Sequence, residues 1–370
     1  MRYVLYIAAM LMCLYGKAQN SYTLTGRVVD EKQAPLPGAT VFLTGTKSIA
    51  ASDGGGNFNL SVLKAGEYKL IVKMVGYKPL VKDVAIREQG MKLSLQLEPD
   101  VKSLRSVTVR PDKSWLDHME TFKQQFLGES ENALHCKLVN SGILTFDYDR
   151  KAEKLTAVAD DILIIKNQEL GYQLKYVLLN FEYDEKKNSV VFMGYPSFEE
   201  LKGTPEEEAQ WKTNRRMAYL GSIHHFVRCI YEQNCKAEGF VVYKIRNRAP
   251  FGFPDANKRP VKVDYDQVSF DSLLTVSDDH HKVLSFKDAL YVVYAKQKEQ
   301  QIYKEKGYSL AGMYITRRVP EGEVSIVNLF GPVTIDDTGA FQPTSSLYFE
   351  GYMGWKKIAD LVPYEYDPVE

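Results

Sequence analysis

Short runs of alternating apolar and polar residues, separated by residues typical of turns, fill the first quarter of the chain. Clear examples are Tyr22–Val29, Gly66–Val72 and Met91–Leu97. The turns between such runs include Pro35–Gly38 and Asp53–Gly56, where glycine accepts the positive φ angles that tight turns need. Strand-length segments at a spacing of about 8–12 residues, with turn signals between them, predict a β-sandwich.

A set of motifs within this region is more specific than the alternation. In chain order the motifs are Gly26–Asp30 (GRVVD), Pro35–Val41 (PLPGATV), Asp53–Phe58 (DGGGNF), Gly66–Tyr68 (GEY) and Val75–Tyr77 (VGY). Together they resemble the carboxypeptidase regulatory-like domain, a transthyretin-like β-sandwich, and Leu104–Val109 resembles the strand that often closes it. The resemblance implies one such domain over residues 19–110 and an origin in the Bacteroidota, where this domain begins many envelope proteins. It implies no peptidase activity, because the sandwich is an accessory domain in that enzyme family.

The first eighteen residues are typical of a cleaved secretory signal peptide. Arg2 supplies the short positive start, and Tyr3–Tyr15 is an uncharged, mostly apolar run that is too short to span a bilayer as a helix. Gly16 and Ala18 place small residues at the −3 and −1 positions of a cut before Gln19. We therefore expect residues 1–18 to be removed. The mature protein is expected to be exported, and to be either periplasmic or associated with the outer membrane.

The cysteines leave two questions open and are not spaced like a zinc site. Cys13 could carry a lipid anchor, but Met12 stands where a small residue is needed, so soluble export is favoured. Cys136, Cys229 and Cys235 remain after cleavage, and an oxidising compartment permits one disulfide among them. The sequence does not decide whether Cys229 and Cys235 pair.

Charge and hydropathy exclude two further classes of protein. The chain has 47 Lys or Arg and 47 Asp or Glu, so its formal net charge is zero. This balance gives no electrostatic reason to expect a nucleic-acid partner, which needs a basic face. After the leader, no segment approaches the roughly 18 consecutive apolar residues of a membrane helix, so no transmembrane helix is expected in the mature chain.

Residues 111–370 are predicted to form a second domain of the α+β type. Helices are expected over Ser114–Leu127 and from Thr204 to about Glu232, and the second begins with a proline and three glutamates in its first turn. The expected strands are Gly142–Tyr148, Lys154–Lys166, Tyr172–Tyr183, Ser189–Met193, Phe240–Arg246, Lys282–Phe286, Ala289–Ala295, Tyr308–Thr316 and Val324–Phe330. The predicted fold class is thus mainly β: an N-terminal β-sandwich followed by an antiparallel-strand region with one long and one shorter helix.

This second part also contains stretches that resemble Bacteroidota envelope proteins carrying the same regulatory-like domain. The stretches are Phe126–Ala133, Leu170–Tyr172, Tyr219–Arg228 and Gly354–Tyr366. The resemblance implies membership of a family of unknown function, and it implies no reaction.

Two adjacent histidines on the longer helix are the first candidate site. His224 falls on an apolar helical stripe, and His225 falls nearer Ser222 and Arg228. Adjacent histidines point in different directions, so they cannot form the i, i+4 clamp that places two imidazoles on one metal. A structural, hydrogen-bonded role in the core is favoured for His224, and a ligand or acid–base role is the alternative.

A second histidine pair stands in the segment Asp278, Asp279, His280 and His281. Two carboxylates and two imidazoles could bind a divalent ion such as Zn²⁺ or Mn²⁺. A polar turn between two strands explains the same residues without an ion, and no second group at motif spacing accompanies them. We therefore favour the turn and expect no metal and no cofactor.

The segment Ile335–Ala340 contains the Asp-Thr-Gly triplet of aspartic proteases. That chemistry needs two carboxylates sharing one proton, and the chain has no second such segment. A strand–turn–strand with the triplet in the turn is the favoured interpretation.

The function predicted from these observations is binding or scaffolding in the envelope, without evident catalysis. The expected partners are other envelope proteins or a polysaccharide, contacted through exposed loops and tyrosines. The alternative is a hydrolase with an unrecognised site in the C-terminal region. Its candidate catalytic residues are His225, Arg228, Asp279 and His280, which would have to converge in one cleft.

Overall fold

The computed structural model describes residues 22–62, 64–87, 90–100, 113–250, 260–278, 280–315 and 317–368. The expected signal peptide, the expected strand Leu104–Val109 and Asp279 lie outside the described residues. None of the helices in the described ranges combines the length and the apolar character that a bilayer span requires.

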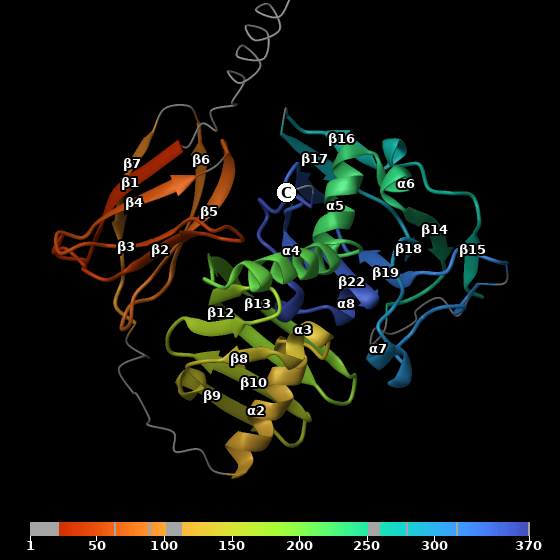
Figure 1. Ribbon diagram of the computed structural model, residues 1–370, viewed down its shortest axis with the longest axis horizontal. Coiled ribbons are helices and arrows are strands. Elements are labelled where there is room, and N and C mark those ends of the chain that lie inside the picture. Colours follow the sequence, from red (N-terminus) through yellow and green to blue (C-terminus); the bar gives the residue numbers. More distant parts are fainter. Residues whose placement is uncertain are drawn as a thin grey trace, which may run out of the picture.

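The N-terminal part is a sandwich of two antiparallel-rich sheets (Figure 1). One sheet has the order β4-β1-β7, from Asn57–Val62, Tyr22–Val29 and Met91–Gln96. The other has the order β3-β2-β5-β6, from Ile49–Ala51, Thr40–Leu43, Gly66–Lys73 and Leu80–Ile86. Alternate residues of β4 are buried, as the period of two predicts, and the apolar faces of both sheets meet in one core. The predicted N-terminal sandwich is confirmed.

A six-stranded sheet forms the central part of the molecule. Its strands are β8 (Cys136–Leu138), β9 (Leu144–Asp149), β10 (Lys154–Ala159), β11 (Leu163–Asn167), β12 (Tyr172–Asp184) and β13 (Ser189–Glu200). Helix α2 (Lys113–Phe126) buries Met119, Phe122 and Phe126 against this sheet. The three side chains follow the three- and four-residue spacing of a helix face that packs on a core.

Two further sheets and a helix form the C-terminal part. The larger sheet has the order β15-β14-β18-β19-β22, from Lys262–Asp264, Phe240–Arg246, Ala289–Tyr294, Glu323–Leu329 and Leu347–Gly351. The smaller has the order β16-β17-β20-β21, from Leu274–Val276, His281–Leu284, Val333–Asp336 and Phe341–Gln342. Helix α5 (Ile223–Glu232) buries Phe226, Val227 and Ile230 in the core between them. The mostly β architecture with antiparallel sheets and few helices confirms the predicted fold class.

Short elements complete the described chain. They are α3 (Glu131–Leu134), α6 (Cys235–Glu238), α7 (Gln301–Glu305), α8 (Tyr352–Trp355) and the 3₁₀ turns Ser141–Ile143, Phe270–Ser272, Thr344–Ser346 and Ile358–Asp360.

The helix expected from Thr204 to about Glu232 is two helices, so its predicted length was wrong. Helix α4 (Pro205–Tyr219) begins as predicted, with Thr204 as the cap and proline in the first turn. It ends before Gly221, which has a φ of +72°. A Cβ at Gly221 would lie 2.1 Å from Oε2 of Glu323, so only glycine fits there. Ser222 then caps α5 by accepting a hydrogen bond from the backbone N–H of His225.

Two strand predictions elsewhere in residues 111–370 were also wrong in detail. The stretch expected as a single strand over Lys154–Lys166 is divided into β10 and β11 by a turn at residues 160–162. The stretch from Tyr308 to Ile315 contains turns and no strand, and Leu310 and Ile315 pack over the larger C-terminal sheet. Apolar residues in this stretch therefore cover a sheet and do not extend it.

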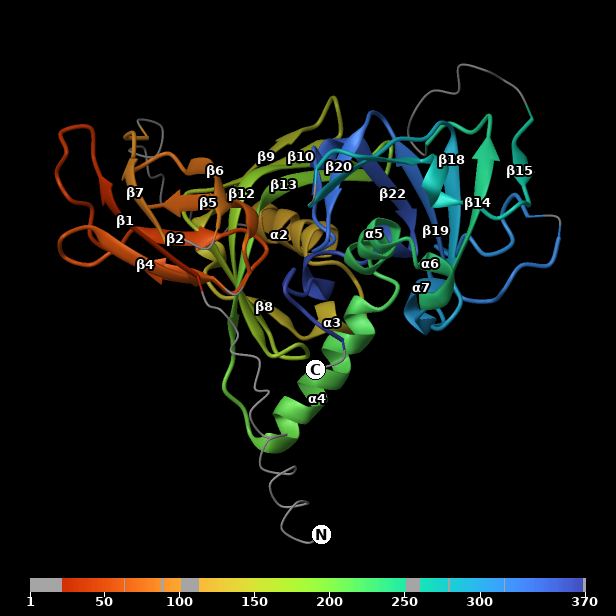
Figure 2. The same ribbon diagram turned by 90° about the horizontal axis from the view of Figure 1, so that it is seen from above.

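The sandwich is fastened to the rest of the molecule by the β2–β3 loop. The backbone N–H of Gly45 donates to the carbonyl of Pro196 (2.7 Å), and the N–H of Tyr364 donates to the carbonyl of Gly45 (2.8 Å). Beside these bonds, Phe42 and Ile71 of the sandwich are buried against Val177 of the central sheet. We call this contact the junction; Figure 2 shows the sandwich lying beside β12 and β13. Hydrogen bonds and apolar packing together give the sandwich a fixed place.

Candidate functional site

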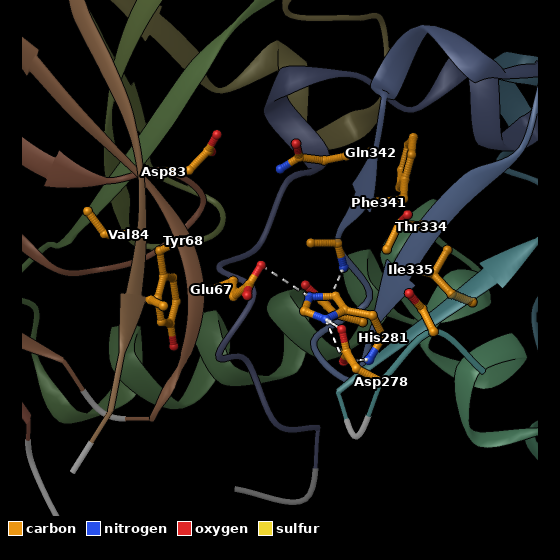
Figure 3. Close-up of a pocket in the computed structure, with 14 residues that line it drawn as sticks. Glu67, Tyr68, Asp83, Val84, Asp278, His281, Thr334, Ile335, Phe341 and Gln342 are labelled. Carbon is orange, nitrogen blue, oxygen red and sulfur yellow. Dashed lines mark hydrogen bonds and ion pairs between the residues drawn. The ribbon is translucent and has the colours of Figure 1, made fainter.

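A cleft with a volume of about 500 Å³ lies between the sandwich and the smaller C-terminal sheet (Figure 3). The residues that line it are Glu67, Tyr68, Asp83, Val84, Ala85, Ser277, Asp278, His281, Thr334, Ile335, Asp336, Ala340, Phe341 and Gln342. A neighbouring cavity of about 410 Å³ shares Glu67, Asp278 and His281 with the cleft. The two cavities therefore adjoin each other, and we call the second one the adjoining hollow.

Strands β5 and β6 form the wall that the sandwich contributes. Glu67 and Tyr68 come from the first residues of β5, and Asp83, Val84 and Ala85 come from β6. The Tyr68 hydroxyl donates to the carbonyl of Lys64 (3.1 Å), and burial raises the pKa of Tyr68. Tyr68 is therefore a neutral, anchored part of this wall.

The opposite wall contains Asp336 and Ala340, which flank the Asp-Thr-Gly triplet of residues 337–339. Asp336 Oδ1 accepts hydrogen bonds from the backbone N–H (2.9 Å) and the hydroxyl (2.6 Å) of Thr338, and from the backbone N–H of Ala340 (3.1 Å). The segment joins β20 to β21, which confirms the strand–turn–strand interpretation. Burial raises the pKa of Asp336, and its carboxylate is used by its own turn. A carboxylate held in this way shapes the wall of the cleft.

His281 links the two walls. Its Nδ1 lies 2.8 Å from Oδ1 of Asp278, and its Nε2 lies 3.8 Å from Oε2 of Glu67 in the sandwich. Asp278 Oδ1 also accepts the backbone N–H groups of His280 and His281, both at 2.9 Å. These bonds to backbone and side chain lower the pKa of Asp278. The described residues of this segment form the turn between β16 and β17, as favoured from the sequence.

The cleft is acidic. Four of its lining residues carry carboxylates, and no Lys or Arg is among them. The side chains of Glu67 and Asp278 remain 61% and 55% exposed, so their charges face solvent at the cleft. Chemically, this lining favours a cationic group over an anionic one.

His225 is held at both ring nitrogens. The backbone N–H of Gly221 donates to Nδ1 (3.1 Å), and Nε2 lies 3.6 Å from Oε2 of Glu238. Desolvation by burial, the largest cause, lowers the pKa of His225 to about 4, so the imidazole is neutral at pH 7. A neutral, buried ring with an occupied Nδ1 is a structural support at the break between α4 and α5.

His224 and Arg228 support the cleft from behind. His224 Nε2 lies 2.5 Å from the carbonyl of Thr338, and burial lowers the pKa of His224 to about 3. Arg228 Nε donates to the carbonyl of Asp337 (3.2 Å), and its Nη1 donates to the carbonyl of Tyr366 (3.1 Å). Both side chains therefore fix the β20–β21 turn that forms one wall. The structural interpretation of His224 agrees with this geometry.

The four candidate catalytic residues are not brought together in one described cavity. His225 and Arg228 line a cavity of about 350 Å³ beside Glu232 and Glu238. His280 lines the adjoining hollow, and Asp279 is outside the described residues. The hydrolase alternative requires these residues to converge in one cleft. Among the described ones, His225 and Arg228 lie at one cavity and His280 lies at another.

In the part of the chain that the structure describes, neither the cysteine thiols nor potential metal ligands form a second candidate site. Cys136, Cys229 and Cys235 are free, and burial raises the pKa of Cys235 to about 12. No group of three or more His, Cys, Asp or Glu residues is placed to hold a metal ion within the described ranges.

Sequence reasoning missed the acids that the sandwich contributes. Glu67 and Asp83 stand at exposed strand positions; Glu67 belongs to the GEY motif of the sandwich, which indicated a fold and no site, and Asp83 belongs to no motif. The sequence singles out Asp278 as part of a favoured polar turn, with metal binding as the alternative, and not as part of a cleft wall. Acids on an exposed strand are ordinary surface residues until another part of the chain is placed opposite them.

Comparison with solved structures gives only partial likenesses. Hydroxyquinol 1,2-dioxygenase from Pseudomonas putida DLL-E4 is 11% identical over 23% of this chain and 58% of that chain, with a TM-score of 0.20. GBS52, the minor pilin of Streptococcus agalactiae, is 16% identical over 26% of this chain and 49% of that chain, with a TM-score of 0.20. A chain of a type II cohesin–X-dockerin complex from Acetivibrio cellulolyticus is 19% identical over 30% and 78%, with a TM-score of 0.19. The chain thus spans less than two thirds of the dioxygenase and pilin chains.

Comparison of sequences is informative for the N-terminal part. No curated protein matches the chain. Residues 24–109 match the model of the CarboxypepD_reg-like domain. The matched range covers β2 to β7 and most of β1, and it confirms that the N-terminal sandwich resembles the carboxypeptidase regulatory-like domain.

Proposed function

We propose that this chain is an exported binding or scaffolding protein of the Bacteroidota cell envelope, and that it holds its partner in the acidic cleft. The observation that carries the proposal is the pairing of a fixed junction with an open cleft. The junction places the sandwich against the central sheet, and the cleft is left between the sandwich and the C-terminal part. A preformed cleft lowers the ordering cost of binding.

The lining of the cleft supports binding more than catalysis. Asp336 is used by its own turn, and Glu67 and Asp278 lie on either side of His281. Ser277 lines the cleft too, and its backbone N–H donates to the carbonyl of His281 (3.0 Å). The His281 Nδ1 is instead 2.8 Å from Asp278 Oδ1, so the observed contacts of the imidazole are with carboxylates and include no nucleophile–base pair among the described residues. Acidic side chains of this kind recognise a charged partner.

Export supports the same proposal from the sequence side. We propose that residues 1–18 are cut off and that the mature chain begins at Gln19. N-terminal sequencing of protein purified from envelopes should return Gln19 or its cyclised form. Protein recovered from the cytosol with Met1 still attached would contradict the export part of the proposal.

Partner capture tests the binding part. The tagged chain would be crosslinked in envelopes, and a Glu67→Gln/Asp278→Asn variant would be compared with a Glu206→Gln/Glu208→Gln control on α4. Both double variants remove two exposed carboxylates, and Asn can keep the turn that Asp278 forms. We expect about a tenfold loss of captured partner for the cleft variant only. Equal capture by both variants would contradict the cleft as the binding site.

The same capture distinguishes the two classes of partner predicted from the sequence. Protease treatment before analysis should remove the captured material, because the acidic lining of the cleft complements the Lys and Arg side chains of a protein. Material that resists protease and yields sugars would instead assign the cleft to a polysaccharide.

A further inference from the structure

The wall formed by β6 presents a strand edge to the cleft. Strand β6 pairs with β5 from Gly66↔Ile86 to Val72↔Leu80, and it pairs with no other strand among the described residues. Asp83, Val84 and Ala85 of β6 line the cleft. Strand β6 therefore both lines the cleft and is the last strand of its sheet among the described residues. Backbone donors and acceptors at such an edge can pair with an added strand.

The opposite wall also ends in a strand at the edge of its sheet. Strand β21 is the last in the order β16-β17-β20-β21, and within the described ranges it pairs only with β20. Figure 3 shows Gln342 and Phe341 of β21 across the cleft from Asp83 and Val84 of β6. The cleft is thus bordered by two strand edges, a shape that suits an extended chain more than a compact ligand.

The charges that line the cleft indicate which side chains an extended peptide would need in order to bind there. Asp83 pairs with Lys69 (2.7 Å), and Asp336 is used by its turn. Glu67 and Asp278 are more than half exposed and have only His281 between them. The adjoining hollow adds one cation, Arg87. The excess of negative charge at the centre of the cleft complements Lys or Arg side chains.

We propose that the partner enters the cleft as an extended, Lys- or Arg-bearing peptide segment that adds as a strand to the edge of β6. Main-chain hydrogen bonds to β6 supply the register, and the carboxylates of Glu67 and Asp278 receive the cationic side chains. The inference rests on the proposed function, because it names the kind of partner segment that the same cleft holds.

Synthetic peptides test the strand addition on the full mature chain. The probe is an eight-residue alternating Lys-Val peptide, measured by fluorescence anisotropy, with a Glu-Val peptide as the charge control. Two further Lys-Val peptides carry N-methyl groups on the odd or on the even residues, because alternate N–H groups of a strand point to the same side. We expect the Lys-Val peptide to bind at least tenfold more tightly than the Glu-Val peptide. At least one methylated peptide should lose tenfold or more in affinity.

If both methylated peptides bound as tightly as the unmethylated peptide, the inference would be overturned. Binding would then depend on the charge of the peptide and not on main-chain hydrogen bonds to β6. Failure of every peptide to bind would also overturn the inference. Either result leaves the proposed function intact if envelope capture still depends on Glu67 and Asp278, so the two failures are distinguishable.

Hydrogen exchange of β6 amides gives a second, independent readout. In the free chain, part of the Leu80–Ile86 amides should exchange quickly, and the Lys-Val peptide should slow them at least tenfold. The Glu67→Gln/Asp278→Asn variant should need more peptide for the same protection, and the Glu206→Gln/Glu208→Gln control should behave as the unmodified chain. Full protection of β6 without peptide would show that the edge is already occupied, and this would overturn the inference.

Discussion

The sandwich meets the rest of the molecule at two places that differ in kind. At the junction, Phe42 and Ile71 are fully buried, and the backbone of Gly45 is hydrogen-bonded on both sides. At the cleft, the acids are partly exposed, and the ion pair across it, from His281 Nε2 to Glu67 Oε2, is 3.8 Å long. The junction buries apolar side chains and pairs the backbone of Gly45, whereas the cleft leaves its acids partly exposed.

This difference separates stability from binding. Burying a side chain such as Phe42 or Ile71 is worth roughly 1.5–3 kcal/mol, whereas an exposed ion pair is worth about 0–1 kcal/mol. The junction should therefore carry the free energy that fixes the sandwich, and the cleft should contribute little to it. Each prediction below tests that division.

The largest effect is expected for Gly45→Ala at the junction. Gly45 has a φ of +76°, and a Cβ there would lie 2.1 Å from Cε2 of Tyr364. Gly38 has a similar φ of +78° but no atom within 4 Å of its Cβ position, so Gly38→Ala is the matched control. We expect urea unfolding to show a loss of about 1 kcal/mol for Gly38→Ala and about 2 kcal/mol more for Gly45→Ala. Losses that agree within about 0.5 kcal/mol would show that the junction does not constrain this loop.

A smaller effect, visible as a pH dependence, is expected from Glu365 at the junction. Its Oε1 accepts the backbone N–H of Lys47 (2.6 Å), and burial raises the pKa of this carboxyl above 4.5. The stability that the protonated carboxyl contributes is fully present below the unfolded pKa and is lost as pH rises through the folded pKa. Glu365→Gln keeps the acceptor and cannot ionise. Its stability relative to the unmodified chain should therefore increase from pH 4 to pH 8, measured by thermal unfolding; a constant difference would contradict the account.

The smallest effect on stability is expected for His281→Gln in the cleft. The side chain loses its contact with Glu67 across the cleft, and Gln can still reach Asp278. Because Glu67 is mostly exposed, we expect a change of less than about 1 kcal/mol in the free energy of unfolding. A loss above about 2 kcal/mol would show that this contact, and not the junction, holds the sandwich in place.

The sequence predicted those features that local chemistry determines. Turn residues such as Pro35–Gly38 indicated the sandwich, and Thr204 with the following proline indicated the start of α4. The break after α4 was not predicted, because the apolar pattern continues past Gly221. Gly221, with a φ of +72°, and the Ser222 cap of α5 are its local signals. The close approach of Glu323, which leaves room only for glycine at position 221, is a tertiary contact that the sequence does not show.

The candidate site was predictable only in pieces. The segments containing Asp278 and Asp336 were recognised as turns, but their common place in one cleft depends on the junction. The histidine pairs show the same limit: His225 is buried in a core and His281 faces a different part of the chain, although both pairs look alike in sequence. Burial and neighbours, which decide what an imidazole does, are properties of the folded chain.

Site-specific photocrosslinking tests the central claim most directly. A photoreactive residue would replace Gln342 in the cleft, with the same replacement at Gln210 on α4 as control; both side chains are exposed in the structure. After illumination in envelopes, the account predicts a partner adduct from position 342 and none above background from position 210. Adducts of equal yield at both positions, or an adduct only at position 210, would contradict the cleft as the place where this protein meets its partner.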